Sequence, residues 1–204
     1  MNQYKEEKSI SGCRPIILAS ASPRRRMLLE GAGIPFTVCV SAADEVTDPI
    51  WTPKRMVREL ARRKASAVAA EHPGTYVIGA DTLVSMDGEV LGKPKNSVDA
   101  VRMLHMLSGR THQVQTGVCV VLPSGHKLTF SEVSEVTFRE LTDREINDYV
   151  ATKEPLDKAG AYAIQGEGRA LIQAFHGDYA NIVGLPVDRL MMILQMVKAI
   201  PSEE

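Results

Sequence analysis

Short apolar runs alternate with stretches of helical periodicity along the chain. The run at 16–19 is apolar at every position, which predicts a buried strand. A helix is expected directly after it, because Ser22 can act as N-cap and Pro23 has no amide hydrogen to leave unpaired. Gly31 or Gly33 can end this helix. The pattern therefore predicts a strand, a cap and a helix.

A second helix is predicted from Thr52-Pro53 towards His72-Pro73. Lys64 lies in phase with the apolar stripe of this helix. A lysine on the core-facing side of a helix must extend to solvent, pair with a counter-ion or face a polar cleft. We favour the cleft. The stripe falls at helical spacing on Val57, Leu60, Ala61 and Val68.

The middle of the chain predicts strands, a tight turn and a third helix. Residues 75–80 are typical of a buried strand ending at Asp81, and Asp87-Gly88 is a turn between two short extended runs. The third helix begins at Ser97 and closes at Gly109. Valine and threonine are frequent in the next two segments, which favours strands there. These segments are 112–122 and 127–138.

The last third begins with a capping box at Thr142–Glu145, which predicts a fourth helix. Strands are expected near 161–164, 170–175 and 181–184, and a final helix from 186 to about 199. The methionines of that final helix are expected in the core or on the face of a homodimer. Because helices and strands alternate while tight turns imply hairpins, the sequence predicts an α/β fold with a mixed sheet.

Composition and charge narrow the classes of function. The 204 residues are 44% hydrophobic, which is enough for a substantial core. Lysine and arginine number 24 against 25 aspartate and glutamate, so no global positive field favours nucleic acid. The N-terminus does not resemble a secretion signal, and no apolar run is long enough to span a bilayer. Three cysteines without metal-binding spacing suit a reducing compartment, so we expect a cytoplasmic protein that binds neither nucleic acid nor membrane.

The segment 20–26 offers the groups that bind a polyphosphate. It combines two hydroxyls, a helix N-terminus and three guanidinium groups within seven positions. The alternative is an ordinary capped helix with a solvated basic first turn. Three cations at a helix N-terminus oppose the helix dipole, however, and call for a compensating anion. The candidate substrate ligands here are Ser20, Ser22, Arg24 and Arg25.

Three further polar residues are candidates, each with a structural alternative. Asp81 can hold a divalent cation or orient water, and Lys93 can neutralise phosphate charge. Taken singly, Asp81 is more readily a turn aspartate and Lys93 a surface lysine, so their functional meaning depends on the other candidate residues. Gln165 can pair with a base edge or with the backbone, and the residues leave both open. Spacings typical of zinc hydrolases, serine hydrolases and P-loop proteins are missing from the sequence.

Five motifs, in this order and spacing, resemble the Maf family over residues 16–197. The resemblance implies an elongated mixed sheet flanked by helices, as in the inosine-triphosphate pyrophosphatases, with a cleft between two lobes. It predicts one Maf-like domain at 16–200 after an N-terminal extension at 1–15. The motifs are Ser20-Ala21-Ser22-Pro23-Arg24-Arg25, Gly79-Ala80-Asp81-Thr82-Leu83-Val84, Gly92-Lys93-Pro94, Leu107-Ser108-Gly109-Arg110-Thr111-His112-Gln113-Val114 and Asp157-Lys158-Ala159-Gly160-Ala161-Tyr162.

The same resemblance implies hydrolysis of nucleoside triphosphates between the α and β phosphates. Asp81 falls on the position of the family's proton acceptor for water, and Lys64 and Lys93 on its phosphate-facing lysines. The acidic metal ligand of the family corresponds to Glu45, with Asp44 adjacent. Together with Asp81 it would hold Mg²⁺ or Mn²⁺. The specificity positions correspond to Arg24, Thr82 and Gln165.

Residues 161–166 and 181–186 resemble the dTTP/UTP branch of this family more than the 7-methyl-GTP branch. The expected substrates are therefore dTTP and UTP, with modified pyrimidine nucleotides included. An amide at Gln165 can donate to O4 and accept from N3–H, but a rotated amide suits cytosine, so CTP stays open. The alternative function is a non-enzymatic, nucleotide-sensing regulator of septum formation, because the family is also associated with inhibition of cell division.

Overall fold

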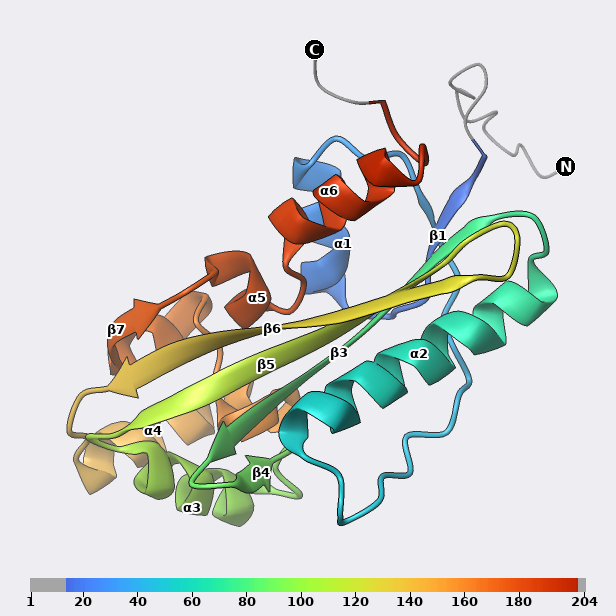
Figure 1. Ribbon diagram of the computed structural model, residues 1–204. Helices are drawn as coiled ribbons and strands as arrows, with labels where there is room; N and C mark the ends of the chain where they lie inside the picture. Colours follow the sequence, from blue (N-terminus) through green and yellow to red (C-terminus); the bar gives the residue numbers. More distant parts are fainter. Residues whose placement is uncertain (1–13, 202–204) are drawn as a thin grey trace, which may run out of the picture.

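A mixed seven-stranded sheet organises the chain (Figure 1). The computed structural model describes residues 14–201. The strands are β1 (Ile16–Leu18), β2 (Thr37–Val38), β3 (Tyr76–Met86), β4 (Glu89–Leu91), β5 (Thr111–Val121), β6 (Lys127–Phe138) and β7 (Ile172–His176). Their order is β2-β1-β3-β5-β6-β7, and β4 pairs with β3 off this path. β1 is parallel to β2 and β3, whereas the other pairs are antiparallel.

Local signals in the sequence set where the helices begin. Ser22, Thr52 and Asn96 each accept a hydrogen bond from a backbone amide of the following first turn, and Thr142 and Glu145 form the predicted capping box. The helices are α1 (Pro23–Gly31), α2 (Pro53–Glu71), α3 (Ser97–Leu107), α4 (Asp143–Ala151), α5 (Tyr179–Val183) and α6 (Val187–Met196), with 3₁₀ helices η1 (Glu154–Asp157), η2 (Ala159–Ala161) and η3 (Gly166–Leu171).

Helix α2 lies directly on one face of the sheet because two strand glycines leave room for its backbone. A Cβ atom on Gly79 would lie 2.5 Å from the carbonyl oxygen of Ala61. A Cβ atom on Gly117 would lie 2.3 Å from that of Val57. Only glycine fits at such distances. This contact sets the height of α2 over β3 and therefore the position of Lys64.

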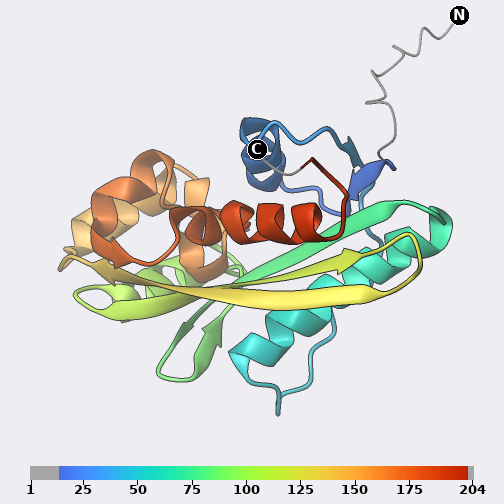
Figure 2. The ribbon, with the colours of Figure 1, turned by 45° about the horizontal axis from the view of Figure 1, so that its top comes forward.

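The opposite face of the sheet is covered by α1 and α6 (Figure 2). Alternation along β3 explains the two faces: Val77 packs with residues of α2, whereas Ile78 packs with residues of α1 and α6. A second core cluster lies around α3, α4 and the 3₁₀ helices, and includes Leu104, Phe138 and Tyr162. The protein thus has two lobes, one built around α1 and α6 and the other around α3 and α4.

Two parts of the predicted secondary structure are wrong. Asp81 does not end a strand, because β3 continues without a break from Tyr76 to Met86. The expected strands near 161–164 and 181–184 do not form; η2 and irregular chain replace the first, and α5 replaces the second. Gly160 and Ala161 have φ values of 69° and 56°, which no strand accommodates. Short apolar runs do not distinguish a strand from a turn of buried helix.

The remaining strand prediction holds in part, since β7 begins at Ile172 rather than at 170. Asp87 and Gly88 have φ values of 51° and 83° and form the predicted turn between β3 and β4. No helix in the described part of the chain is both long and apolar enough to cross a membrane.

Candidate active site

A cavity of about 660 Å³ opens between the two lobes. Pockets for small-molecule ligands typically measure about 300–1,000 Å³, so a nucleotide fits within this size range. The structure brings together the ten candidate substrate, catalytic and metal residues named from the sequence. The ten that line the cavity are Ser20, Ser22, Arg24, Arg25, Glu45, Lys64, Asp81, Thr82, Lys93 and Gln165.

Lys64 bridges two carboxylates on the cavity wall. Its Nζ atom lies 2.6 Å from Oδ1 of Asp81 in β3 and 2.7 Å from Oε1 of Glu45. The hydrogen bond from Lys64 lowers the pKa of Glu45, although burial acts in the opposite direction. Lys64 therefore combines two of the predicted alternatives, because it both finds counter-ions and faces a polar cleft.

The paired carboxylates fit a hard divalent cation. Two negative groups share one ammonium, so the cluster keeps one net negative charge, and its oxygen donors are those that Mg²⁺ and Mn²⁺ prefer. Asp44 is the neighbouring acid that the sequence could not separate from Glu45. Its Oδ1 accepts from the backbone amide of Val46 at 2.9 Å, so Asp44 closes a local turn while Glu45 faces Lys64.

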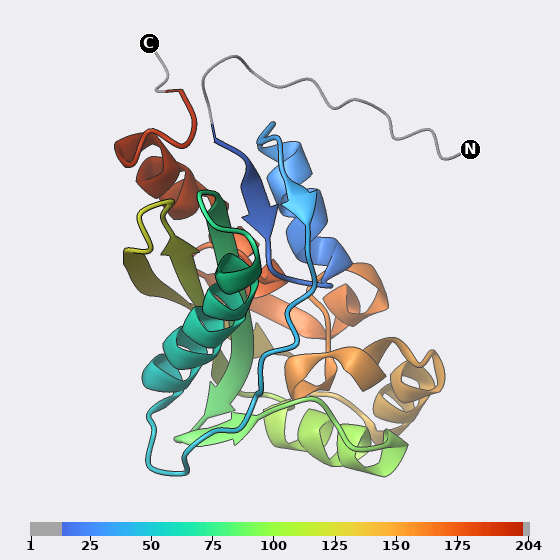
Figure 3. The ribbon, with the colours of Figure 1, turned by 90° about the vertical axis from the view of Figure 1, so that its right-hand side faces the viewer.

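The segment that carries Glu45 is held against α2. Residues 39–52 run back along this helix from β2 to its first turn (Figure 3). Nη1 of Arg63 donates to the carbonyl oxygen of Val46 at 2.5 Å. The guanidinium groups of Arg55 and Arg63 lie 5.4 and 5.2 Å from the ring centroid of Trp51. These contacts position Glu45 opposite Asp81, and sequence reasoning did not identify them because they depend on how the segment folds back.

Arg25 joins three elements at the base of the cavity. Its Nε donates to the carbonyl oxygen of Gly184 at 2.8 Å, and its two terminal nitrogens donate to Ser20 Oγ at 3.1 Å and Thr82 Oγ1 at 3.0 Å. Burial lowers the pKa of Arg25, although the charge of Asp81 acts in the opposite direction. Thr82 Oγ1 also lies 2.9 Å from Thr116 Oγ1 on β5. Arg25 thus fixes the loop after β1 against the centre of β3.

The three arginines of the first helical turn have different surroundings. Arg26 is exposed and its Nε lies 2.8 Å from Oε1 of Glu30 one turn later, so it lies outside the cavity. Arg24 is half-buried and lines the cavity, and its side chain makes no hydrogen bond or ion pair with the residues at 14–201. We therefore expect the compensating anion to bind at Arg24 and the helix N-terminus rather than at all three guanidinium groups.

Lys93 and Gln165 face the cavity with their polar groups free. Both side chains are exposed, and neither forms a hydrogen bond within the described part of the chain. Gln165 is the cap residue of η3, yet its side chain does not cap that helix. This arrangement does not support the backbone-pairing alternative for Gln165 and leaves its amide available to a ligand.

The far wall of the cavity is the segment 157–165, which includes the 3₁₀ helix η2. Asp157 and Lys158 form an ion pair here and line the cavity, although neither was expected at the site. Their place within the fifth motif was the signal available. Behind this wall the hydroxyl of Tyr162 lies 2.7 Å from Nε2 of His112. Burial of His112 lowers the pKa of its imidazole to about 4. A neutral imidazole therefore fixes Tyr162 and the wall that it belongs to.

Known proteins resemble this chain over most of its length. The family described as Maf-like protein matches residues 15–197. A protein named dTTP/UTP pyrophosphatase from Bacillus cereus (strain AH820) is 50% identical over 182 residues, which cover 89% of this chain and 95% of the relative. A protein of the same name from Bacillus cytotoxicus has the same identity and coverage.

Solved structures of low sequence identity share the fold. The Ham1 protein of Staphylococcus aureus matches with a TM-score of 0.51 and 16% identity, over 90% of this chain and 99% of that one. A HAM1 protein from Coxiella burnetii matches with a TM-score of 0.51 and 14% identity over the same shares. This likeness concerns the fold alone, and with the observed sheet it confirms the predicted mixed α/β architecture.

Proposed function

This chain belongs to the Maf family, and on that premise we propose that it hydrolyses dTTP and UTP to the nucleoside monophosphate and pyrophosphate. The proteins named dTTP/UTP pyrophosphatase that match 89% of this chain at 50% identity support these substrates. The observation that carries the chemistry is the carboxylate pair of Glu45 and Asp81 around Lys64, on the wall of a cavity of nucleotide size.

The lining of the cavity supports one orientation of the substrate. The polyphosphate lies against the loop 20–25 and the N-terminus of α1, where Arg24 and Lys93 supply positive charge. The base lies against the segment 157–165, where Gln165 offers a donor and an acceptor for O4 and N3–H of uracil or thymine. Ser20, Ser22 and Arg25 build the phosphate loop through their mutual hydrogen bonds.

A carboxylate next to bound phosphates suggests hydrolysis rather than binding alone. A site that only senses a nucleotide gains nothing from negative charge beside the phosphates, whereas metal-assisted hydrolysis requires it. Glu45 and Asp81 are the residues that would hold Mg²⁺ or Mn²⁺. When bound there, the cation neutralises charge on the phosphate oxygens.

Asp81 orients water towards the α-phosphorus and accepts its proton as the new P–O bond forms. The bond from the α-phosphorus to the bridging oxygen breaks, and pyrophosphate leaves with the negative charge that Lys64, Lys93 and Arg24 stabilise. Thr82 follows Asp81 on β3. Its hydrogen bonds with Arg25 and Thr116 hold this part of the strand in place.

Pyrophosphate release across a nucleotide panel tests the proposal. With Mg²⁺ or Mn²⁺ present, we expect dTTP and UTP to give one monophosphate and one pyrophosphate per turnover, and purine triphosphates to be poor substrates. CTP and modified pyrimidine nucleotides belong in the same panel. Release of inorganic phosphate with a diphosphate product would contradict cleavage between the α and β phosphates. Tight nucleotide binding without turnover would favour the regulator instead.

A further inference from the structure

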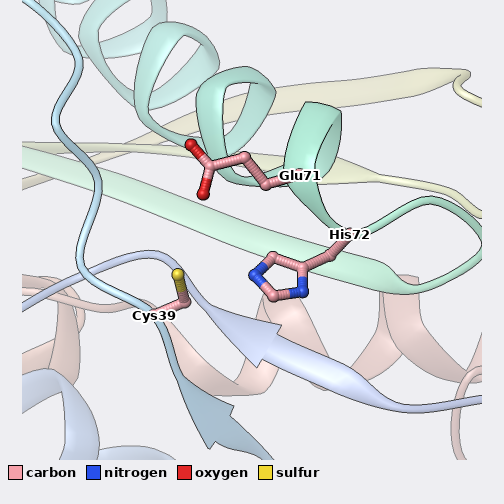
Figure 4. A group of neighbouring side chains, drawn as sticks. All are labelled: Cys39, Glu71 and His72. Atoms are coloured by element: carbon pink, nitrogen blue, oxygen red, sulfur yellow. The ribbon is translucent and has the colours of Figure 1, made fainter.

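Cys39, Glu71 and His72 lie together at the C-terminal end of α2 (Figure 4). Their thiol, carboxylate and imidazole donor atoms all lie within 4.8 Å of one another. None of the three residues lines the cavity between the lobes. Cys39 follows β2, whereas Glu71 ends α2 and His72 is its C-cap. The sequence gives no hint of this cluster, because its cysteine and histidine come from separate elements.

The three donors are a ligand set for zinc rather than for magnesium. Thiolate and imidazole are borderline or soft ligands, and three protein ligands with one water are a common tetrahedral zinc arrangement. Zinc–ligand bonds of about 2.0–2.3 Å at tetrahedral angles place neighbouring donor atoms roughly 3.3–3.8 Å apart. The observed limit of 4.8 Å lies about one ångström beyond this range, so rotation of side chains is enough to close the site.

The surroundings of the cluster favour a cation independently of its ligands. The carbonyl groups at the end of α2 carry the negative end of the helix dipole, and the last turn of this 19-residue helix contains no basic residue. The side chains of Cys39, Glu71 and His72 form no hydrogen bond or ion pair within residues 14–201. Their backbone is fixed, since Cys39 N donates to Leu18 O at 3.1 Å and His72 N to Val68 O at 3.1 Å.

We propose that Cys39, Glu71 and His72 bind one Zn²⁺ ion, with water as the fourth ligand. Binding replaces the thiol proton of Cys39, which passes to solvent as the sulfur–zinc bond forms. The ion links the end of β2 to the end of α2. It thereby fixes the start of the segment 39–52, which continues through Ser41 to Glu45 at the carboxylate pair.

Cobalt provides a direct test, because a cobalt–thiolate bond gives a charge-transfer absorption band that oxygen ligands do not. The full-length reduced protein is titrated with Co²⁺ in excess Mg²⁺, which occupies oxygen-only sites, and Zn²⁺ is then added. We expect one equivalent of Co²⁺ to produce the band and one equivalent of Zn²⁺ to remove it. Equilibrium dialysis with Zn²⁺ alone gives the affinity.

Variants assign the band to the cluster. Cys39→Ser should abolish it. His72→Gln and Glu71→Gln should weaken metal binding by more than the roughly 10–100-fold typical of losing a supporting group around a metal. Cys13→Ser and His126→Gln are matched controls and should bind as the wild type does. Far-UV circular dichroism confirms that each variant is folded. Absence of the band in the wild type, or its survival in Cys39→Ser, would overturn the proposal, and neither result bears on nucleotide hydrolysis.

Discussion

Asp81 and Gln165 occupy opposite walls of the cavity and represent two kinds of functional residue. Asp81 is rigid, because it lies within a continuous strand and bonds to Lys64 at 2.6 Å. Gln165 is exposed and its amide is free of partners in the described part of the protein. A fixed carboxylate suits the control of water and charge, and an available amide suits the selection of a base.

Asp81→Asn should lower turnover by about 10²–10⁴-fold or more, because asparagine keeps the shape of aspartate but cannot accept the proton or balance a divalent cation. Steady-state pyrophosphate release measures the effect. Asp44→Asn is the matched control, since Asp44 is exposed and only closes a local turn. Wild-type rates in Asp81→Asn, with the control equally active, would refute the role of Asp81.

Gln165→Leu should reduce the preference for dTTP and UTP over other nucleotides by roughly ten- to a hundredfold, since a buried base edge without its partner costs about 1–3 kcal/mol. The measurement is the ratio of kcat/KM values between dTTP and GTP. Gln173→Leu on β7 serves as the control, because Gln173 is exposed and does not line the cavity. If the wild type hydrolyses GTP or 7-methyl-GTP as fast as dTTP, the pyrimidine preference is wrong although the pyrophosphatase activity stands.

At the scale of elements, the contact between α2 and the sheet determines the geometry of the carboxylate pair. Lys64 reaches Asp81 because Gly79 and Gly117 allow the backbone of α2 to lie against β3 and β5. Asp81 pairs with Gly117 across the two strands, so the closest approach of helix and sheet coincides with the candidate catalytic position.

Gly117→Ala should destabilise the protein by about 1–3 kcal/mol or more, because the added methyl group would collide with the backbone of Val57 and force α2 away from the sheet. Chemical denaturation measures the change in the free energy of unfolding. Gly31→Ala is the control, since no atom lies within 4 Å of a Cβ at that position. Equal stability of the two variants would show that α2 can shift without cost. Loss of activity in a folded Gly117→Ala variant would support the inference that the distance of α2 from the sheet determines how Lys64 meets Asp81 and Glu45.

At the scale of the whole molecule, stability should depend on pH through His112. This residue is 2% exposed, and burial lowers its pKa from 6.5 to about 4. The unfolded chain binds this proton below about pH 6.5 whereas the folded protein does not. Stability is therefore fully present above pH 6.5 and falls as the pH drops towards 4, by on the order of 3 kcal/mol.

Unfolding measured between pH 7 and pH 4 tests this dependence. His112→Gln should flatten the curve, because the titrating group is gone, although it also lowers stability at pH 7 through the lost contact with Tyr162. His126→Gln, which changes an exposed histidine, should leave the slope as in the wild type. If stability falls with pH equally in His112→Gln and in the wild type, the dependence belongs to carboxylates instead. Glu45 is one such group, because its pKa is lowered in the folded protein and its contribution to stability is lost in acid.

The sequence by itself determined features that depend on neighbouring residues. The caps at Ser22 and Thr142 and the turn at Asp87-Gly88 form as predicted, because each uses hydrogen bonds or backbone preferences within a few positions. The ordered motifs also predicted the family, which the match over residues 15–197 confirms. Only the tertiary structure decided which acid faces Lys64, that Asp81 lies within a strand, and that Cys39 meets His72. These features arise where separate elements pack together. Ala161 takes a left-handed φ of 56° beside Gly160, which packs against Val84 of β3, and the local preference of alanine does not specify this conformation.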